Sequence, residues 1–195
     1  MVSFSLANEV TIVTGACGGL AHTLLQELLQ HGAPLALFDR NEDALRVTRT
    51  QLQQYATDEL SLKPDAVPAI HVYACDIADS VAVHAAVNRI EADFGTPATH
   101  LVNTAGYCEN FPAEEYPAAN AEALMRVNLL GSLYIAQAFA KPLIAKGIRD
   151  ASIVMVGSMS GIIVNDPQPQ IAYNMSKAGV IHMVRSLAVE WAKYG

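Results

Sequence analysis

Short apolar runs alternate with amphipathic stretches along most of the chain. The first run, VTIVTG at 10–15, is rich in β-branched residues and ends in glycine. Leucines at helical spacing follow it as far as Gly32 and predict a helix behind the first strand. The same order recurs four more times, with predicted strands at 34–39, 69–76, 99–106 and 151–158. Helical patterns follow these strands at about 41–55, 83–94, 119–146 and 180–191.

This alternation predicts the fold class. Strands that read as nearly continuous apolar runs are buried on both faces, as in a parallel sheet covered by crossover helices. We therefore predict a doubly wound parallel α/β sheet in three α/β/α layers. It forms a single domain over residues 1–195.

The helix predicted at 119–146 is apolar on more than one face. Between Leu124 and Ile144 it carries only Arg126 and Lys141 as charged residues. A helix that is apolar nearly all round is covered on two sides. The sheet can cover one side and a second subunit the other, so we expect a homo-oligomer, a dimer or a tetramer.

Composition excludes several classes of partner. Hydrophobic residues make up 52% of the 195 residues, and the net charge is -7 without a basic cluster, which argues against nucleic acid. We find no membrane span and no signal peptide in MVSFSLANEV, so we expect no membrane partner. Cys17, Cys75 and Cys108 lack disulfide or zinc spacing, which predicts reduced thiols, no metal and a cytoplasmic location.

A glycine-rich turn follows the first predicted strand. TGACGGLA at 14–21 places small residues where a backbone can approach a pyrophosphate at a helix N-terminus. Its place between strand and helix distinguishes it from a mere tight turn. Gly15, Gly19 and Leu20 are therefore candidate dinucleotide-binding residues, which predicts a Rossmann fold.

An acidic residue ends the second predicted strand. Asp39 lies 20 residues after Gly19, where a carboxylate can bind a ribose 2′-hydroxyl. Its charge repels a 2′-phosphate and so favours NAD over NADP, although the adjacent Arg40 can attract phosphate. Alternatively Asp39 caps the next helix, a role that Asn41 could fill equally well.

Polar residues also end the other predicted strands. Asp76 and Asn103 end the third and fourth strands. Ligands of open α/β sheets bind beyond the carboxyl ends of the strands. We therefore expect Gly15, Asp39, Asp76, Asn103 and Ser158 to converge on one edge of the sheet.

The chain resembles the short-chain dehydrogenase/reductase family over its whole length. The order and spacing of several motifs carry this resemblance: TGACGGLA, CDI (75–77), NTAG (103–106), VNLLG (127–131), VGSMSG (156–161) and YNMSK (173–177). The resemblance implies an NAD(P)-dependent oxidoreductase acting on CH–OH groups. It also implies a catalytic set of Asn128, Ser158, Tyr173 and Lys177, and adds Ala105, Gly106, Tyr173 and Lys177 to the cofactor-binding residues.

The resemblance also implies the role of each catalytic residue. Tyr173 would take the substrate proton, Ser158 would hold the substrate oxygen, and Lys177 would hold the nicotinamide ribose, with Asn128 supporting a water relay. The spacing agrees, because residues four apart share a helix face and an ammonium there favours an ionised phenol. The alternatives are a helix-surface tyrosine, a solvated lysine, a loop-capping serine and a helix-kinking asparagine.

Two departures from the family pattern stand out. Ala21 replaces the third glycine of the turn, and we expect binding to survive this smallest replacement. The chain ends at EWAKYG, where family members continue into a sixth strand, a Pro-Gly turn, a substrate-covering segment and a last strand. We therefore expect a domain truncated after the catalytic helix that lacks the last strands of the sheet.

Two segments narrow the expected substrate. GSMSGIIVNDPQPQIAYNMSKAGV (157–180) is similar to fungal polyol dehydrogenases. Residues 103–128 look most like the subgroup that interconverts D-arabinitol and D-ribulose with NAD. Asn165, Gln168 and Gln170 bring amides to the loop beside Tyr173, where with Ser158 they could bind polyol hydroxyls or else only shape the loop. The alternatives are an NADP(H)-linked ketose, mannitol, sorbose or ketoacyl reductase, and a non-catalytic nucleotide-binding or subunit-interaction protein.

Overall fold

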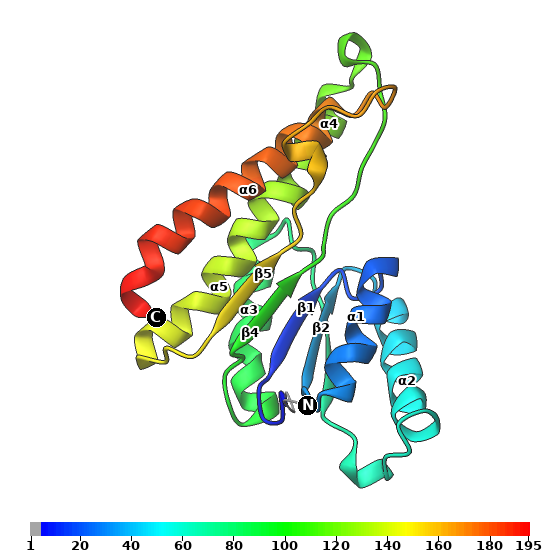
Figure 1. Cartoon of the computed structure of the whole chain (residues 1–195), viewed down its shortest axis with the longest axis vertical. Helices are drawn as coiled ribbons and strands as arrows, with labels where there is room; N and C mark the ends of the chain where they lie inside the picture. Colours follow the sequence, from blue (N-terminus) through cyan, green and yellow to red (C-terminus); the bar gives the residue numbers. More distant parts are fainter. Residues whose placement is uncertain (1–4) are drawn as a thin grey trace.

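A five-stranded parallel sheet forms the centre of the computed structural model, which describes residues 5–195 (Figure 1). The strand order is β3-β2-β1-β4-β5. The strands span Thr11–Thr14 (β1), Leu35–Asp39 (β2), Ile70–Ala74 (β3), His100–Asn103 (β4) and Ser152–Met155 (β5). In the register, Thr14 pairs with Phe38 on one side and with Asn103 on the other, so the strands end nearly level. The predicted doubly wound parallel sheet is confirmed.

Helices follow the strands in the predicted order. They span Gly19–Gln30 (α1), Glu42–Asp58 (α2), Ser80–Phe94 (α3), Ala118–Met125 (α4), Ser132–Lys146 (α5) and Ile171–Trp191 (α6). Short 3₁₀ turns lie at Pro64–Ala66, Ala113–Glu115, Met159–Gly161 and Ala192–Tyr194.

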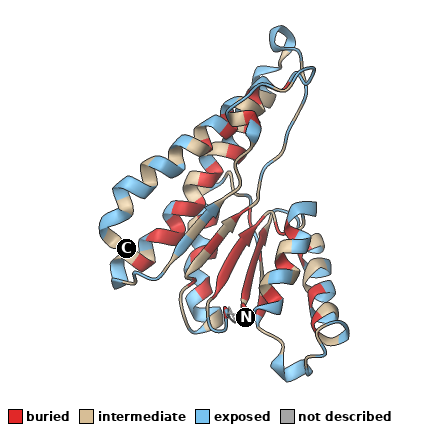
Figure 2. Ribbon diagram, in the orientation of Figure 1, coloured by how far each residue is buried: buried red, intermediate tan, exposed pale blue. Residues whose placement is uncertain are grey.

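Both faces of the sheet carry core residues, as the alternation of side chains along a strand requires. On β1, Ile12 packs into the cluster shared with α3 and α5, whereas Val13 packs into the cluster shared with α1 and α2. Figure 2 shows the buried residues concentrated in the central strands and the helix faces turned toward them. On the edge strand β5, Ile153 and Met155 join the α3–α5 cluster, but Val154 points the other way and is 52% exposed.

The predicted long helix is one helical stretch with an irregular turn. A π-helical segment, Arg126–Gly131, joins α4 to α5. By length and composition alone, residues 118–146 could cross a membrane, since an 18-residue part of this stretch has a mean hydropathy of 1.2. Half of that apolar stretch is buried within the domain, as in the core helix of a globular protein. The sheet and α3 contact α5, and α6 contacts α4 and the π-helical segment, so neighbours within this chain cover several of its apolar faces.

The apolar face predicted for the last helix is buried only near its beginning. Val180 is buried, whereas Val184 is 39% exposed. Beyond Val180 the helix borders an apolar groove of about 320 Å³ lined by α5, β5 and α6. The sequence pattern could not reveal this, because periodicity defines a face without specifying how far it is covered.

Candidate cofactor and catalytic site

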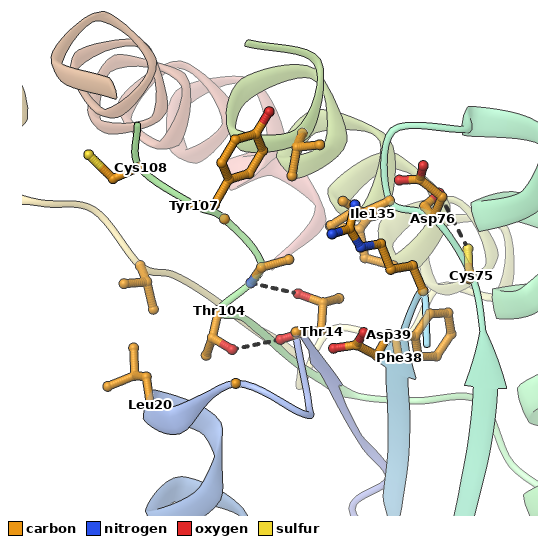
Figure 3. A pocket seen from close by; sticks show the side chains of 18 of the residues that line it. Thr14, Leu20, Phe38, Asp39, Cys75, Asp76, Thr104, Tyr107, Cys108 and Ile135 are labelled. Atoms are coloured by element: carbon orange, nitrogen blue, oxygen red, sulfur yellow. Dashed lines mark hydrogen bonds between the residues drawn. The ribbon is translucent and has the colours of Figure 1, made fainter. Parts of the chain in front are cut away.

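The principal candidate site is a pocket of about 500 Å³ along the carboxyl edge of the sheet. It is lined by the predicted cofactor residues Gly15, Gly19, Leu20, Asp39, Asp76, Ala105, Gly106, Tyr173 and Lys177. Figure 3 shows Leu20, Asp39, Asp76 and Tyr107 around this cavity, carried by segments that follow different strands. Its volume lies within the range of cofactor sites, about 300–1,000 Å³.

The glycine turn brings two backbone segments into contact at the floor of the pocket. Gly15 has a φ of +62°, and a Cβ added there would lie 2.9 Å from the Cα of Ala105. Only glycine fits this backbone conformation and this approach. The amide of Gly18 donates to the carbonyl of Gly15 at 2.9 Å, and α1 then begins without a side-chain cap. Its first amides are left for an anionic ligand such as a pyrophosphate.

The departure at Ala21 is accommodated in the core. Ala21 is fully buried in the cluster between α1, α2 and the sheet. Its methyl group therefore packs against the sheet beneath the turn, and it does not line the pocket.

The backbone holds both carboxylate oxygens of Asp39. Oδ2 accepts the amide of Cys17 at 3.3 Å, and Oδ1 accepts the amide of Asn41 at 3.2 Å. The cap of α2 is Asn41, whose Oδ1 accepts the amide of Ala44 at 3.0 Å. The helix-capping alternative for Asp39 is therefore wrong. Its carboxylate is oriented at the pocket wall with acceptor capacity to spare, and the exposed Arg40 lines the same pocket.

The structure does not bring Asn103 to this pocket. Asn103 ends β4 as predicted, but it is 3% exposed and does not belong to the described lining of the pocket. Its Oδ1 accepts the hydroxyl of Thr14, and its Nδ2 donates to Ser132 Oγ at 2.8 Å. Asn103 thus joins β1, β4 and α5 beneath the pocket floor, because the direction of its side chain follows the pleat of the strand.

Other lining residues were not singled out in the sequence. Ile77, Thr104 and Val156 lie inside the motifs CDI, NTAG and VGSMSG. The motifs therefore indicated these segments of the pocket, but not which of their residues line it. Tyr107 and Cys108 also line the pocket, directly after NTAG. They fall within residues 103–128, which resemble the arabinitol subgroup, but their place in the pocket depends on where the chain runs after β4.

Asn128 lies in the π-helical segment and is completely buried. Its Nδ2 donates to the carbonyl of Tyr107 at 2.8 Å and to Ser176 Oγ at 3.2 Å, while its Oδ1 accepts the amide of Tyr107 at 3.0 Å. A Cβ at Gly106 would lie 3.1 Å from Asn128 Oδ1 and 3.6 Å from Lys177 Nζ. Asn128 therefore connects the pocket wall at Tyr107 with α6. The helix irregularity expected there is also present.

Tyr173 and Lys177 lie on α6 with Lys177 buried. Lys177 is 6% exposed, its Nζ donates to the carbonyl of Val156 at 2.7 Å, and it lies 5.8 Å from the centre of the Tyr173 ring. Burial lowers the pKa of Lys177 below its ordinary value, because desolvation disfavours the ammonium. The alternative of a solvated lysine is therefore wrong.

Ser158 follows β5 and caps the short turn Met159–Gly161. It does not belong to the described lining of the pocket, although it was expected to converge there with Gly15, Asp39 and Asp76. Its Oγ accepts the amide of Ser160 at 3.1 Å, so it caps this turn, as the alternative suggested. The hydroxyl proton is still free to donate, so capping and substrate binding are compatible. A Cβ at Gly161 would lie 2.7 Å from the carbonyl carbon of Lys177. Residues 158–161, which we call the serine turn, therefore pack directly against the helix that carries Tyr173 and Lys177.

The structure places Asn165 and Gln168 on the loop before α6. The Nδ2 of Asn165 donates to Ser160 Oγ at 2.9 Å. Gln168 is exposed, and its backbone amide donates to the carbonyl of Asn165 at 2.9 Å. Neither belongs to the described lining of the pocket. These bonds support the loop-shaping alternative for Asn165.

The fold and the pocket define a dinucleotide-binding domain with a buried lysine beside a tyrosine. Residues 9–195 match the family model described as short chain dehydrogenase, and the chain belongs to this family. It is therefore an NAD(P)-dependent oxidoreductase. Gly15, the free amides of α1 and the oriented carboxylate of Asp39 fit such a cofactor.

Comparison with individual proteins confirms the resemblance to polyol enzymes. The chain is 57% identical over 192 residues to the NADH-dependent L-xylulose reductase of Ambrosiozyma monospora, covering 98% of this chain and 70% of that protein. It is 50% identical over 193 residues to the ribulose-forming D-arabinitol 2-dehydrogenase of Scheffersomyces stipitis, covering 98% and 69%. The crystal structure of an NAD⁺-bound xylitol dehydrogenase superposes with a TM-score of 0.84 at 26% identity, covering 97% and 67%.

Proposed function

We propose that this protein is an NAD-dependent polyol dehydrogenase that interconverts a sugar alcohol and a ketose, with D-arabinitol and D-ribulose as the first candidate pair. The observation that carries the proposal is the buried Lys177 beside Tyr173 in the same pocket as Asp39. The similarity to D-arabinitol 2-dehydrogenases supports this substrate class. The higher identity to an L-xylulose reductase favours L-xylulose as a second candidate.

In the proposed mechanism, the chain holds the substrate oxygen and moves one proton. The Ser158 hydroxyl donates a hydrogen bond to the substrate oxygen. In the oxidative direction the phenol oxygen of Tyr173 accepts the proton of the substrate hydroxyl, and in the reductive direction it returns that proton. The bound nicotinamide supplies the hydride acceptor for the same carbon. Lys177 stabilises negative charge on the phenol oxygen and holds the nicotinamide ribose.

In this mechanism Asn128 has a structural role, because it holds two parts of the site in place. Its side chain is fully engaged with the backbone of Tyr107 and with Ser176. It therefore keeps the pocket wall and α6 in register beside Lys177, and its helix segment supports the proposed water relay to that lysine.

We propose NAD as the preferred cofactor because the Asp39 carboxylate is held in place by two backbone amides. A fixed carboxylate can accept both ribose hydroxyls and repels a 2′-phosphate. The L-xylulose reductase of Ambrosiozyma monospora is NADH-dependent, which supports the same preference.

We also propose that the protein works in the cytoplasm as a homo-oligomer, a dimer or a tetramer. The exposed apolar residues of α6, including Val184 and Val189, support an oligomer because they leave part of this helix uncovered within the chain.

The test is turnover with a panel of polyols and ketoses, each with the NAD and the NADP couples, followed by nicotinamide absorbance. The panel includes D-arabinitol, xylitol, mannitol, D-ribulose and L-xylulose. Tyr173→Phe should lower turnover by about 10²- to 10⁴-fold with unchanged NAD binding, because the proton acceptor is lost. Tyr55→Phe on α2, far from the pocket, is the matched control.

Each result has a definite reading. Undiminished turnover in Tyr173→Phe would refute the proton-transfer role. Retained NAD binding without turnover on any substrate would favour a non-catalytic nucleotide-binding protein instead.

A further inference from the structure

A buried polar network lies behind the proposed catalytic residues. Its centre is Gln170, which is 6% exposed, as is its neighbour Ser160. Gln170 Nε2 donates to Ser160 Oγ at 3.1 Å, and Gln170 Oε1 accepts the thiol of Cys108 at 3.3 Å. Both ends of the buried amide are thus paired. Such a paired amide favours one local arrangement, because breaking either bond leaves a buried polar group without a partner.

The network ends at Ser158. Two amides, those of Gln170 and Asn165, donate to Ser160 Oγ and hold this residue in place. The backbone amide of Ser160 in turn donates to Ser158 Oγ. Because this amide occupies one lone pair of Ser158, the hydroxyl proton turns away from it and is available to the substrate oxygen.

Gln170 is also the N-cap residue of α6, the helix that carries Tyr173. Its carbonyl accepts the amide of Asn174 at 3.0 Å. Tyr173 follows three residues later, within the first helical turn. The side chain of Gln170 is therefore bonded to the serine turn while its backbone is bonded to the tyrosine helix.

The third segment in the network is the pocket wall. Cys108, which bonds Gln170, lines the pocket. Next to this contact the amide of Phe111 donates to the carbonyl of Pro169 at 2.9 Å. Gln170 thus lies where the serine turn, the tyrosine helix and the wall after β4 meet.

We propose that Gln170 is a positioning residue that fixes the separation between the hydroxyl groups of Ser158 and Tyr173. The proposal rests on the proposed function, since both hydroxyls must reach one substrate oxygen. Gln170 itself touches neither substrate nor cofactor. Its loss lowers turnover more than NAD affinity, because Gly15, Asp39 and Asp76 lie on segments of the pocket outside this network.

The first test is Gln170→Met, which keeps the length of the side chain and removes both hydrogen bonds. We expect kcat to fall about 10- to 100-fold, the size of effect produced when a reacting group is misplaced by an ångström or less. The Kd for NAD should rise by a smaller factor than kcat falls, because Gly15, Asp39 and Asp76 lie outside the network. Gln53→Met makes the same substitution at an exposed position on α2 and should leave kcat unchanged.

A pH profile separates positioning from packing. In Gln170→Glu, only the protonated carboxyl can donate to Ser160 as the amide does. The ratio of kcat in this variant to kcat in the unchanged protein should therefore rise as the pH is lowered. A flat ratio, or a kcat within twofold of the unchanged protein for Gln170→Met, overturns the proposal.

Hydrogen exchange tests the network independently of activity. The Ser160 amide should exchange at least tenfold faster in Gln170→Met and at the original rate in Gln53→Met. If the unchanged protein binds NAD without turnover, the proposed function fails and the exchange rate still decides whether Gln170 positions this turn. An unchanged exchange rate overturns the proposal in that case too.

Discussion

Replacing Asp39 with asparagine tests how this protein chooses between NAD and NADP. The carboxylate ends β2 at the pocket and is held by the amides of Cys17 and Asn41. Asp39→Asn keeps the shape of the side chain and one acceptor oxygen but removes the charge. NADP differs from NAD by a phosphate on the ribose 2′-oxygen, the group that this carboxylate would face.

Coulomb's law sets the size of the effect. Two unit charges about 4 Å apart interact by about 1 kcal/mol in bulk water and about 4 kcal/mol at an effective dielectric constant of about 20. Asp39 is half-buried at an open pocket, so the repulsion should lie between these limits, at about 2 kcal/mol. Since about 1.4 kcal/mol corresponds to a tenfold change, Asp39→Asn should shift the preference toward NADP about 30-fold. Part of this shift is weaker NAD binding, because a charge-assisted hydrogen bond to the ribose is lost.

The assay is kcat/KM for both cofactors with the best polyol, together with Kd values from cofactor titration. Asp43→Asn, at an exposed position in the first turn of α2, removes the same charge away from the pocket and should leave the ratio unchanged. An unaltered NADP-to-NAD ratio in Asp39→Asn, or an unchanged protein that already prefers NADP, would refute the reasoning.

Three further perturbations test the site and its surroundings. Gly15→Ala should lower the free energy of unfolding by about 1–2 kcal/mol for the left-handed backbone and by about 1–3 kcal/mol for the overlap with Ala105. This loss should be measured as a lower Tm and weaker NAD binding. Lys177→Met should abolish turnover. The Tm of this variant relative to that of the unchanged protein should fall as the pH rises toward 10.5, because the lowered pKa of Lys177 means that its buried ammonium opposes folding at lower pH and the opposition fades as the lysine becomes neutral. Burial raises the pKa of the Cys75 thiol from 9.0 to about 11, so its contribution to stability is complete below pH 9 and is lost as the pH rises to about 11. The free energy of unfolding in urea should therefore decline less steeply over this interval in Cys75→Ala than in the unchanged protein. An equal decline in the two proteins would contradict the assignment.

Features governed by local geometry could be predicted from the sequence. The alternation of strands and helices followed from residue periodicity, and the glycine turn followed from its place after the first strand. Asp39 was found because its distance from the turn is fixed by one helix and one strand. Asn103 was placed correctly at a strand end, but its side chain points to Thr14 and Ser132, and sequence position alone does not give that direction.

The loop before α6 shows the opposite case. Asn165, Gln168 and Gln170 were all expected to offer amides to a substrate, because an amide-rich loop beside a tyrosine suits a polyol. The structure instead pairs the Asn165 amide with Ser160 and leaves Gln168 exposed outside the pocket lining. Gln170 was also expected to face the substrate, but it is buried outside the pocket lining and occupies the centre of the network. Residue type does not distinguish these positions, because burial decides which amide is paired.

By itself the sequence determined the order of the elements, the cofactor turn and the tyrosine–lysine pair on one helix face. Each depends on residues close together in the chain or on a periodic pattern. Only the tertiary structure decided that Lys177 is buried against the carbonyl of Val156 and that Asn128 is engaged with Tyr107. These contacts join residues 21 positions apart in each case, on different elements. Their existence depends on how the helices pack on the sheet, which no local pattern specifies.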